Sequence, residues 1–154
     1  MGNCGLKLMS SFKGQYSYIL DTKGRINIPA KFRKTIAQEA NDTFVLTRGL
    51  ENCVYAYPLD EWKIIEEKLR TLPTTQKENR LFIRMTTSYA TEVQFDKQGR
   101  IALPQYLIEL SKIKKDVLII GTLNKLEIWS PDVYEEYLKG NNQSYEDLAE
   151  KIEI

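Results

Sequence analysis

Two short stretches of the chain place an aspartate, a glycine and an arginine at the same spacing. Residues 21–25 are Asp-Thr-Lys-Gly-Arg and residues 96–100 are Asp-Lys-Gln-Gly-Arg. An aspartate side chain can accept hydrogen bonds from the amides of a turn, and an arginine four residues later can return to the same carboxylate. The glycine holds the position that most readily adopts a positive φ. Each stretch therefore predicts a tight turn at the tip of a β-hairpin.

The chemistry of these turns supports two interpretations, and the residues alone leave both open. In the first, Asp21, Gly24, Asp96 and Gly99 form a purely structural turn clamp. In the second, the clamp also holds an arginine and a lysine at an exposed tip, where they are ready to bind an anionic partner.

The residue types argue against an enzyme. The chain has no histidine, which excludes Ser-His and Cys-His catalysis. Cys4 and Cys53 have no spacing suited to a metal site, so we expect neither a metal nor a cofactor. Asp21 and Asp96 are the obvious repeated carboxylates, but the arginines beside them should keep them ionised, which is the wrong state for a general acid.

The charge of the chain is nearly balanced but unevenly distributed. There are 22 basic and 21 acidic residues, a net charge of +1, so the overall balance does not indicate a nucleic-acid partner. Residues 1–40 hold seven basic and two acidic residues, whereas residues 131–154 hold two basic and seven acidic ones. This asymmetry is compatible with a basic face on a neutral protein, and equally with two solvated ends that attract each other.

The two turns belong to a longer repeat. Five residues have identical partners 75 positions later: Asp21, Gly24, Arg25, Ile26 and Pro29 match Asp96, Gly99, Arg100, Ile101 and Pro104. Matches this dense predict two tandem copies of one structural unit. We expect each copy to run strand, hairpin, strand, short helix, two strands, helix.

The apolar residues follow this plan. Alternation predicts a first strand ending near residue 20 and its counterpart over residues 91–95. Proline suits the first turn of a helix, so helices should begin at Pro29 and Pro104 and bury their apolar stripes. Further strands are expected over residues 43–47, 53–57, 116–120 and 126–129.

A connecting helix is expected between the copies. Thr75 and Glu78 have the spacing of a capping box at its start. This helix should turn Leu81, Phe82 and Met85 inward. A last, acidic helix is expected over residues 145–152, either on the surface or against a neighbouring subunit.

These elements define the expected organisation of the chain. No run of about 18 apolar residues occurs, so no membrane span is expected. Two cysteines are most simply explained as reduced thiols of a cytoplasmic protein. The expected segments are an N-terminal extension (1–11), a first repeat (12–73), a connecting helix (74–88), a second repeat (89–140) and a C-terminal helical tail (141–154).

The motifs of the chain resemble those of the MraZ family. The resemblance is carried by Phe12-Lys-Gly-x-Tyr, Asp21-x-x-Gly-Arg-Ile-x-Ile-Pro, Tyr57-Pro with Trp62, the second Asp-x-x-Gly-Arg, and Glu127-Ile-Trp. It covers residues 12 to 138. The MraZ family is similar in fold to the AbrB and MazE DNA-binding domains, in which two hairpins exchange to form a swapped barrel. The resemblance therefore implies an α+β fold, a tandem-repeat, swapped-hairpin, AbrB-like β-barrel with flanking helices, built by one chain.

The resemblance also implies a function. It is that of a bacterial transcriptional regulator that binds short direct repeats in the promoter of its own operon, the division and cell-wall gene cluster. Members of the family close into a ring, so the implied partners are double-stranded DNA and further copies of the chain, in a cytoplasmic, nucleoid-associated protein. No membrane and no small-molecule substrate are implied. The main alternative is a structural, ring-forming assembly module without specific DNA recognition, in which the cations at the tips are merely solvated.

The resemblance assigns roles to individual residues. The DNA-contacting arginine of the family corresponds to Arg25, with Lys23 at the same tip. We expect Arg25 to bond to a guanine edge, and Lys13 and Lys23 to hold phosphates. In the second copy the lysine is displaced to Lys97, so Lys97 and Arg100 are candidates for a lesser DNA contact, with Arg100 serving mainly in the turn clamp.

Overall fold

The structure is a computed structural model that describes residues 11–36 and 40–153. Within them the chain is α+β, and its elements come in the repeated order that the sequence predicts. The first half comprises β1 (Phe12–Ile19), β2 (Arg25–Asn27), α1 (Ala30–Thr35), β3 (Thr43–Arg48), β4 (Val54–Pro58) and α2 (Leu59–Arg70), followed by α3 (Lys77–Ser88). The second half comprises β5 (Thr91–Gln94), β6 (Arg100–Ala102), α4 (Gln105–Ser111), β7 (Asp116–Leu123), β8 (Leu126–Trp129) and α5 (Pro131–Lys139), followed by α6 (Tyr145–Ile152).

The two halves exchange strands. β1 of the first half pairs with β7 of the second, and β5 of the second half pairs with β3 of the first. β4 and β8 pair at the centre, which gives a six-stranded antiparallel sheet in the order β1-β7-β8-β4-β3-β5. β2 and β6 pair with each other in a separate two-stranded ribbon, so the strands on either side of each glycine turn do not pair with each other as the predicted β-hairpins would require. Neither half can therefore complete its share of the sheet without the other.

The sheet is not the closed barrel that was expected. Within the described residues β1 and β5 are its open edges, and the ribbon of β2 and β6 is a second sheet. The ribbon extends its own ladder, because Ile28 donates its N–H to the carbonyl of Gly99 (3.0 Å) and Leu103 donates to that of Gly24 (2.8 Å). The backbone groups of β2 and β6 thus bond to each other and not to the large sheet, so β1 and β5 are not joined through the ribbon into a barrel.

The main core lies between one face of the large sheet and a layer formed by the ribbon, α1 and α4. Ile26 and Ile101 of the ribbon are buried, as are Phe32 of α1 and Leu107 of α4, which confirms the inward stripes expected for both helices. The ring of Phe32 meets that of Phe12 on β1 edge to face, 5.6 Å between centroids. The sheet contributes mainly Phe44, Leu46, Val54, Ala56, Val117, Ile119, Leu126 and Ile128.

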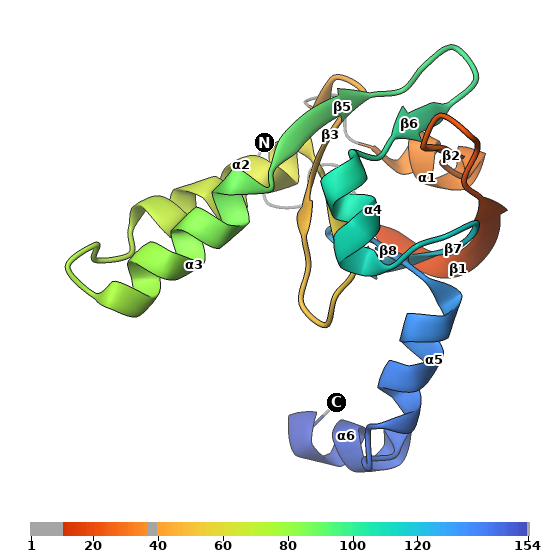
Figure 1. The fold of residues 1–154 in the computed structure, drawn as a ribbon. Coiled ribbons are helices and arrows are strands. Elements are labelled where there is room, and N and C mark those ends of the chain that lie inside the picture. Colours follow the sequence, from red (N-terminus) through yellow and green to blue (C-terminus); the bar gives the residue numbers. More distant parts are fainter. Residues whose placement is uncertain (1–10, 37–39, 154) are drawn as a thin grey trace, which may run out of the picture.

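The opposite face of the sheet is covered at two places. Val45 and Tyr57 alternate with the core residues of β3 and β4 and pack with Trp62 of α2 in a second apolar cluster. In the second half, Trp129 at the end of β8 packs on Tyr134 of α5, 4.9 Å between ring centroids. Figure 1 shows α2 and α3 projecting together from one side of the molecule, while α5 and α6 leave from another.

The orientation of α3 is the main error of the sequence prediction. Leu81, Phe82 and Met85 do not point inward: their exposed fractions are 55%, 50% and 38%. The side-chain hydroxyl of Thr47 on β3 donates to the carbonyl of Thr86 (2.7 Å), which holds the more polar side of α3 against the sheet. The half-buried residues of α3 are Asn79, Arg80, Ile83 and Thr86, which lie on one side of the helix at positions i, i+1, i+4 and i+7, and Leu81, Phe82 and Met85 lie outside that side.

The start of α3 also differs from the expected capping box. The N-cap residue is Gln76 rather than Thr75, and no side chain caps the helix. Instead, Asn79 and Arg80 reach back to the preceding turn and donate to the carbonyls of Pro73 (2.9 Å) and Thr74 (3.0 Å).

Several boundaries were predicted correctly. Pro29 and Pro104 are the N-cap residues of α1 and α4, and α6 spans the residues expected for the last helix. The capping box of α6, between Ser144 and Asp147, was not foreseen. Residues 1–10 of the expected N-terminal extension, Cys4 among them, lie outside the described residues. Among the helices described, none is long and apolar enough to cross a membrane.

Candidate nucleic-acid interface

The first candidate tip is a tight turn organised by one carboxylate. Asp21 Oδ1 accepts the backbone N–H groups of Lys23 (2.9 Å) and Arg25 (2.8 Å), and Oδ2 accepts Nε of Arg25 (2.8 Å). Gly24 closes the turn with φ +76°, a backbone conformation that L side chains rarely adopt. The carboxylate thus fixes the turn and the direction of the arginine together.

The second candidate tip has the same geometry. Asp96 Oδ1 accepts the N–H groups of Gln98 (2.8 Å) and Arg100 (2.9 Å), and Oδ2 accepts Nε of Arg100 (2.8 Å). Gly99 has φ +77°. The sequence repeat is therefore also a repeat of atomic geometry.

Hydrogen bonding keeps both carboxylates ionised. The backbone N–H of Arg25 contributes most to lowering the pKa of Asp21, and the arginine side chain adds to it. The backbone N–H of Arg100 acts in the same way on the pKa of Asp96. Neither aspartate can serve as a proton donor near neutral pH, while both can orient a guanidinium.

The ribbon brings the two tips onto one surface. Arg25 lies opposite Ala102, and Asn27 lies opposite Arg100 in the antiparallel register. Ile26 and Ile101 alternate with them and point into the core, so the other four residues share the outer side of the ribbon. The guanidinium side chains of Arg25 and Arg100 are 30% and 24% exposed.

The two tips are also in direct contact. Nη1 of Arg100 lies 3.7 Å from Oδ2 of Asp21, so an arginine of one half reaches the carboxylate of the other. Arg25 and Arg100 thus lie in one charged cluster with Asp21 and Asp96, in which Asp21 contacts both arginines.

A further arginine joins the second tip. A Cβ placed on Gly99 would lie 2.7 Å from Cζ of Arg33, so the guanidinium of this α1 residue lies directly over the turn. Its Nε donates to the carbonyl of Ile28 (3.1 Å), which holds it there. Sequence analysis did not assign Arg33 to the site, although the basic residues Lys31, Arg33 and Lys34 stand out in the sequence of α1.

The two helices that flank the tips differ in charge. The repeat aligns Arg33 of α1 with Ile108 of α4, and Ile108 lies over the first tip, 3.5 Å from a Cβ built on Gly24. The second tip, which has one lysine and one arginine of its own as the first does, therefore receives a further arginine from the other half.

The predicted lysines lie in different places. Lys23 and Lys97 are exposed at the two tips. Lys13 is exposed as well, but it pairs with Thr122 at the opposite end of β1. Six residues of extended strand separate it from Ile19, about 20 Å at 3.3 Å per residue, so the fold does not bring Lys13 to the tips.

Another set of lysines lies beside the first tip and was missed. Leu20 donates its N–H to the carbonyl of Lys115 (2.8 Å), which places the loop between α4 and β7 beside the start of the first turn. Lys112, Lys114 and Lys115 are exposed on this loop. Their cationic character is moderated by Asp116, Asp132 and Glu136, which line the same shallow hollow.

The described residues offer little for other chemistry. They contain no cluster of three or more residues able to hold a metal ion. Cys53 is buried, and burial raises the pKa of its thiol, so it is not a reactive thiolate at neutral pH.

Comparison with known protein families gives matches over nearly the whole chain. The sequence model of the family described as "MraZ protein, putative antitoxin-like" matches residues 11–85 and 87–152. The two matched stretches correspond closely to the two structural halves with their following helices.

Curated relatives agree with this match. The chain is 51% identical over 140 residues to the "Transcriptional regulator MraZ" of Caldanaerobacter subterraneus subsp. tengcongensis, which covers 91% of this chain and 95% of the relative. It is 47% identical over 141 residues to the protein of the same name from Natranaerobius thermophilus, covering 92% and 96%. It is 49% identical over 140 residues to that of a Thermoanaerobacter species, covering 91% and 95%.

Proposed function

The chain belongs to the MraZ family, and from this premise we propose that it is a DNA-binding transcriptional regulator whose ribbon of β2 and β6 contacts the double helix. The named relatives are regulators of transcription rather than enzymes. The observation that carries the proposal is the pair Arg25 and Arg100, both held by ionised carboxylates on the outer side of one exposed ribbon.

The dimensions of the ribbon suit this role. A two-stranded β-ribbon fits the major groove of B-DNA, which is about 12 Å wide. The outer side of the ribbon presents polar side chains from both strands, while Ile26 and Ile101 anchor its inner side in the core. A rigid, core-anchored ribbon can present arginines to base edges with little loss of side-chain freedom.

Arg25 is the residue we assign to base recognition. Asp21 accepts its Nε, which leaves the two terminal nitrogens of the guanidinium for the O6 and N7 acceptors of guanine. Such a bidentate contact is worth about 1–3 kcal/mol of discrimination against the wrong base. Arg100 has the same geometry and is assigned the equivalent, lesser contact.

The exposed lysines are assigned to the phosphate backbone. Lys23 and Lys97 at the tips would contact phosphates beside the groove, and Arg33 would strengthen the second tip. Lys13, at the far end of β1, would reach only DNA that extends past the ribbon. A few cations per chain give weak binding on their own.

Weak DNA binding by a single chain favours a DNA target that several chains can bind at once. We propose that several copies of the chain, arranged in a ring, place their ribbons on successive direct repeats, so that affinity comes from multivalency. By resemblance to the family, the target is the promoter of the protein's own division and cell-wall operon, and the protein associates with the nucleoid.

A decisive experiment measures binding to the DNA upstream of the protein's own gene and to a shuffled duplex of equal length. Fluorescence anisotropy is recorded for the wild type, Arg25→Ala and Lys13→Ala across a series of salt concentrations. Arg25→Ala should abolish the preference for the specific duplex, whereas Lys13→Ala should weaken both duplexes equally or not at all. Equal losses on both duplexes for Arg25→Ala would refute the base-reading role.

The alternative function is a ring-forming assembly module without specific DNA recognition. The exposed apolar side chains of α3 favour it, since they are suited to contacts between subunits. The same salt series separates the two functions. Binding to DNA that does not weaken as salt rises would favour the assembly module over recognition of the double helix.

A further inference from the structure

Two helices on different parts of the molecule leave apolar side chains uncovered. On α3 these are Leu81, Phe82 and Met85, which we call the α3 stripe. On α6, Tyr145 and Ile152 are 84% and 66% exposed, and the partly exposed Leu148 and Ala149 lie between them on the same side of the helix. Tyr145, Leu148, Ala149 and Ile152 stand at positions i, i+3, i+4 and i+7, so they form one continuous α6 stripe.

The two stripes have flanking charges of opposite sign. On α3 the basic residues Lys77, Arg80 and Arg84 outnumber the single acid Glu78. On α6 three acids outnumber one base: Glu146, Asp147 and Glu150 against Lys151. Large uncovered apolar surfaces on a soluble chain commonly mark interaction sites, and here the two surfaces complement each other in charge.

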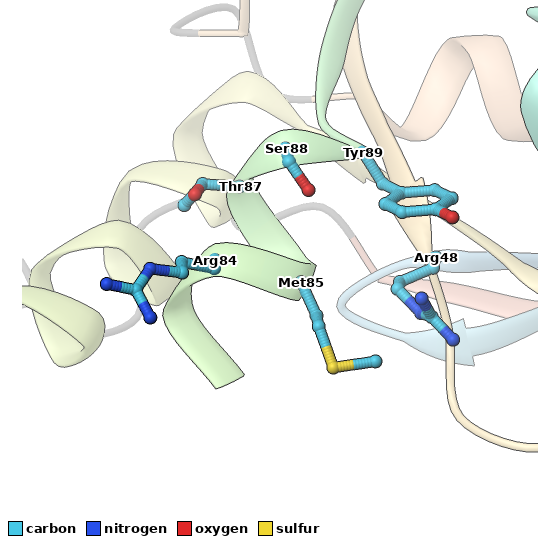
Figure 2. A pocket seen from close by; sticks show the side chains of 6 residues that line it. All are labelled: Arg48, Arg84, Met85, Thr87, Ser88 and Tyr89. Carbon is cyan, nitrogen blue, oxygen red and sulfur yellow. The ribbon is translucent and has the colours of Figure 1, made fainter. Parts of the chain in front are cut away.

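The α3 stripe continues into a hollow of about 550 Å³ at the end of the helix. The guanidinium of Arg48 stacks 4.8 Å from the centre of the Tyr89 ring on one side of it. Figure 2 shows Met85 between Arg84 and Arg48, so the apolar stripe is bordered by cations on both sides. This surface suits an amphipathic, acidic helix.

We propose that α6 of one copy of this chain docks on the α3 stripe of a second copy. This docking deepens the proposed function, because it names the surfaces by which copies would align their ribbons on successive DNA repeats. Only that alignment on DNA rests on the proposed function. The shorter helix fits within the longer one: at 1.5 Å per residue the 12 residues of α3 span about 18 Å and the 8 of α6 about 12 Å.

The placement of the two helices makes the contact head-to-tail. α3 and α6 leave the molecule on different sides (Figure 1), so every copy has one α6 helix that can dock and one α3 stripe that can receive it. Heterologous contacts of this kind propagate, and they generate a ring if the rotation between copies closes. A symmetric contact of α3 with α3 would instead bring like charges together.

The test uses two variants, each defective in one stripe. The first is Leu81→Ser with Phe82→Ser, and the second is Tyr145→Ser with Ile152→Ser. All four side chains are at least half exposed, so neither variant loses core packing. A matched control, Ile64→Ser with Leu123→Ser, removes two equally exposed apolar side chains elsewhere. Melting temperatures close to that of the wild type confirm that each variant is folded.

Sedimentation velocity without DNA then reports the assembly state. We expect the wild type and the control to form assemblies larger than a dimer, and each stripe variant to sediment as a monomer. An equimolar mixture of the two stripe variants should form a one-to-one complex and nothing larger, because the mixture contains one intact α3 stripe and one intact α6 stripe per pair. A contact of α3 with α3, or of α6 with α6, does not give this result.

Three outcomes would overturn the inference: a monomeric wild type at 100 μM protein, an α6 variant that assembles like the wild type, or a mixture in which no complex forms. The proposed function is tested separately, by binding of the monomeric variants to a duplex with a single repeat. Stripe variants that remain assembled but still bind the specific duplex would refute only the docking. Monomeric variants that bind a shuffled duplex as tightly as the specific one would refute only the function.

Discussion

Arg100 of the second half lies 3.7 Å from the carboxylate of Asp21 in the first half, a carboxylate that already holds Arg25 at 2.8 Å. Asp96 holds Arg100 but has no corresponding contact with Arg25 among the described residues. The internal repeat is thus not fully symmetric at its tips. Asp21 links the two halves at the surface, in addition to the apolar core that joins them inside.

This asymmetry predicts that the two aspartates differ in importance. Asp21→Asn should lower the melting temperature more than Asp96→Asn, because it weakens two guanidinium contacts instead of one. It should also reduce specific DNA binding more, since both arginines lose part of their orientation. Differential scanning fluorimetry and anisotropy on the same two variants check both statements. An equal shift in melting temperature would show that the contact of Arg100 with Asp21 is without consequence.

The lowered pKa values predict the response of stability to acid. Asp21 and Asp96 have folded-state pKa values below the ordinary 3.8, so the unfolded state binds protons first as pH falls. Their contribution to stability is complete well above the ordinary value of 3.8, and it is lost as pH falls through the lower folded value.

The measurement is a series of thermal unfolding curves from pH 7 to pH 2. The melting temperature of the wild type should show no effect of these two groups between pH 5 and 7 and should fall below about pH 4. The variant with both Asp21→Asn and Asp96→Asn should start lower and fall less steeply. A parallel fall in the two proteins would assign the acid sensitivity to other carboxylates.

The position of Arg33 over Gly99 predicts a coupled pair of effects. Gly99→Ala forces a residue with a Cβ into φ +77°, which costs about 1–2 kcal/mol, and the new Cβ displaces the Arg33 side chain. DNA binding should therefore weaken in Gly99→Ala and in Arg33→Gln, with a salt slope lower by about 0.9 in each. The double variant should bind no more weakly than Gly99→Ala alone.

Gly24→Ala is the matched control for this experiment. It imposes the same backbone strain at φ +76°, and the new Cβ would lie 3.3 Å from the carbonyl oxygen of Leu103 and 3.5 Å from Cδ1 of Ile108, neither of which carries a charge. We expect a similar loss of stability with an unchanged salt slope. An unchanged slope in Gly99→Ala as well would mean that Arg33 does not contact phosphates.

Much of the fold is encoded locally and could be predicted. The repeat of Asp, Gly and Arg specifies two identical turns, because each carboxylate finds its partners within five residues. Pro29 and Pro104 specify helix starts for an equally local reason. These predictions required no knowledge of how distant segments meet.

The features that could not be predicted depend on contacts between segments that are distant in the sequence. The outward direction of Leu81, Phe82 and Met85 depends on which side of α3 meets the sheet, and α3 is joined to β3 by a hydrogen bond from Thr47, 39 residues before its partner Thr86. Arg33 reaches the second tip only because the two halves exchange strands. From the sequence of α1 alone, Arg33 is predicted to be a solvent-exposed residue of the helix. The open sheet likewise follows from the pairing of β2 with β6 across the repeat.

The exchange of strands predicts that the halves depend on each other for folding. A fragment of residues 11–74 would leave β1 without β7 and β3 without β5, and Ile26 and Phe44 would lose apolar partners from the second half. Separately produced fragments 11–74 and 75–154 should therefore show no cooperative thermal unfolding as monomers, because neither can bury a sufficient core. Mixing them should restore a cooperative transition and the circular dichroism of the intact chain. Cooperative unfolding of either fragment as a monomer would show that the halves are independent domains, and the shared ribbon could then not be the rigid platform on which the proposed DNA contact depends.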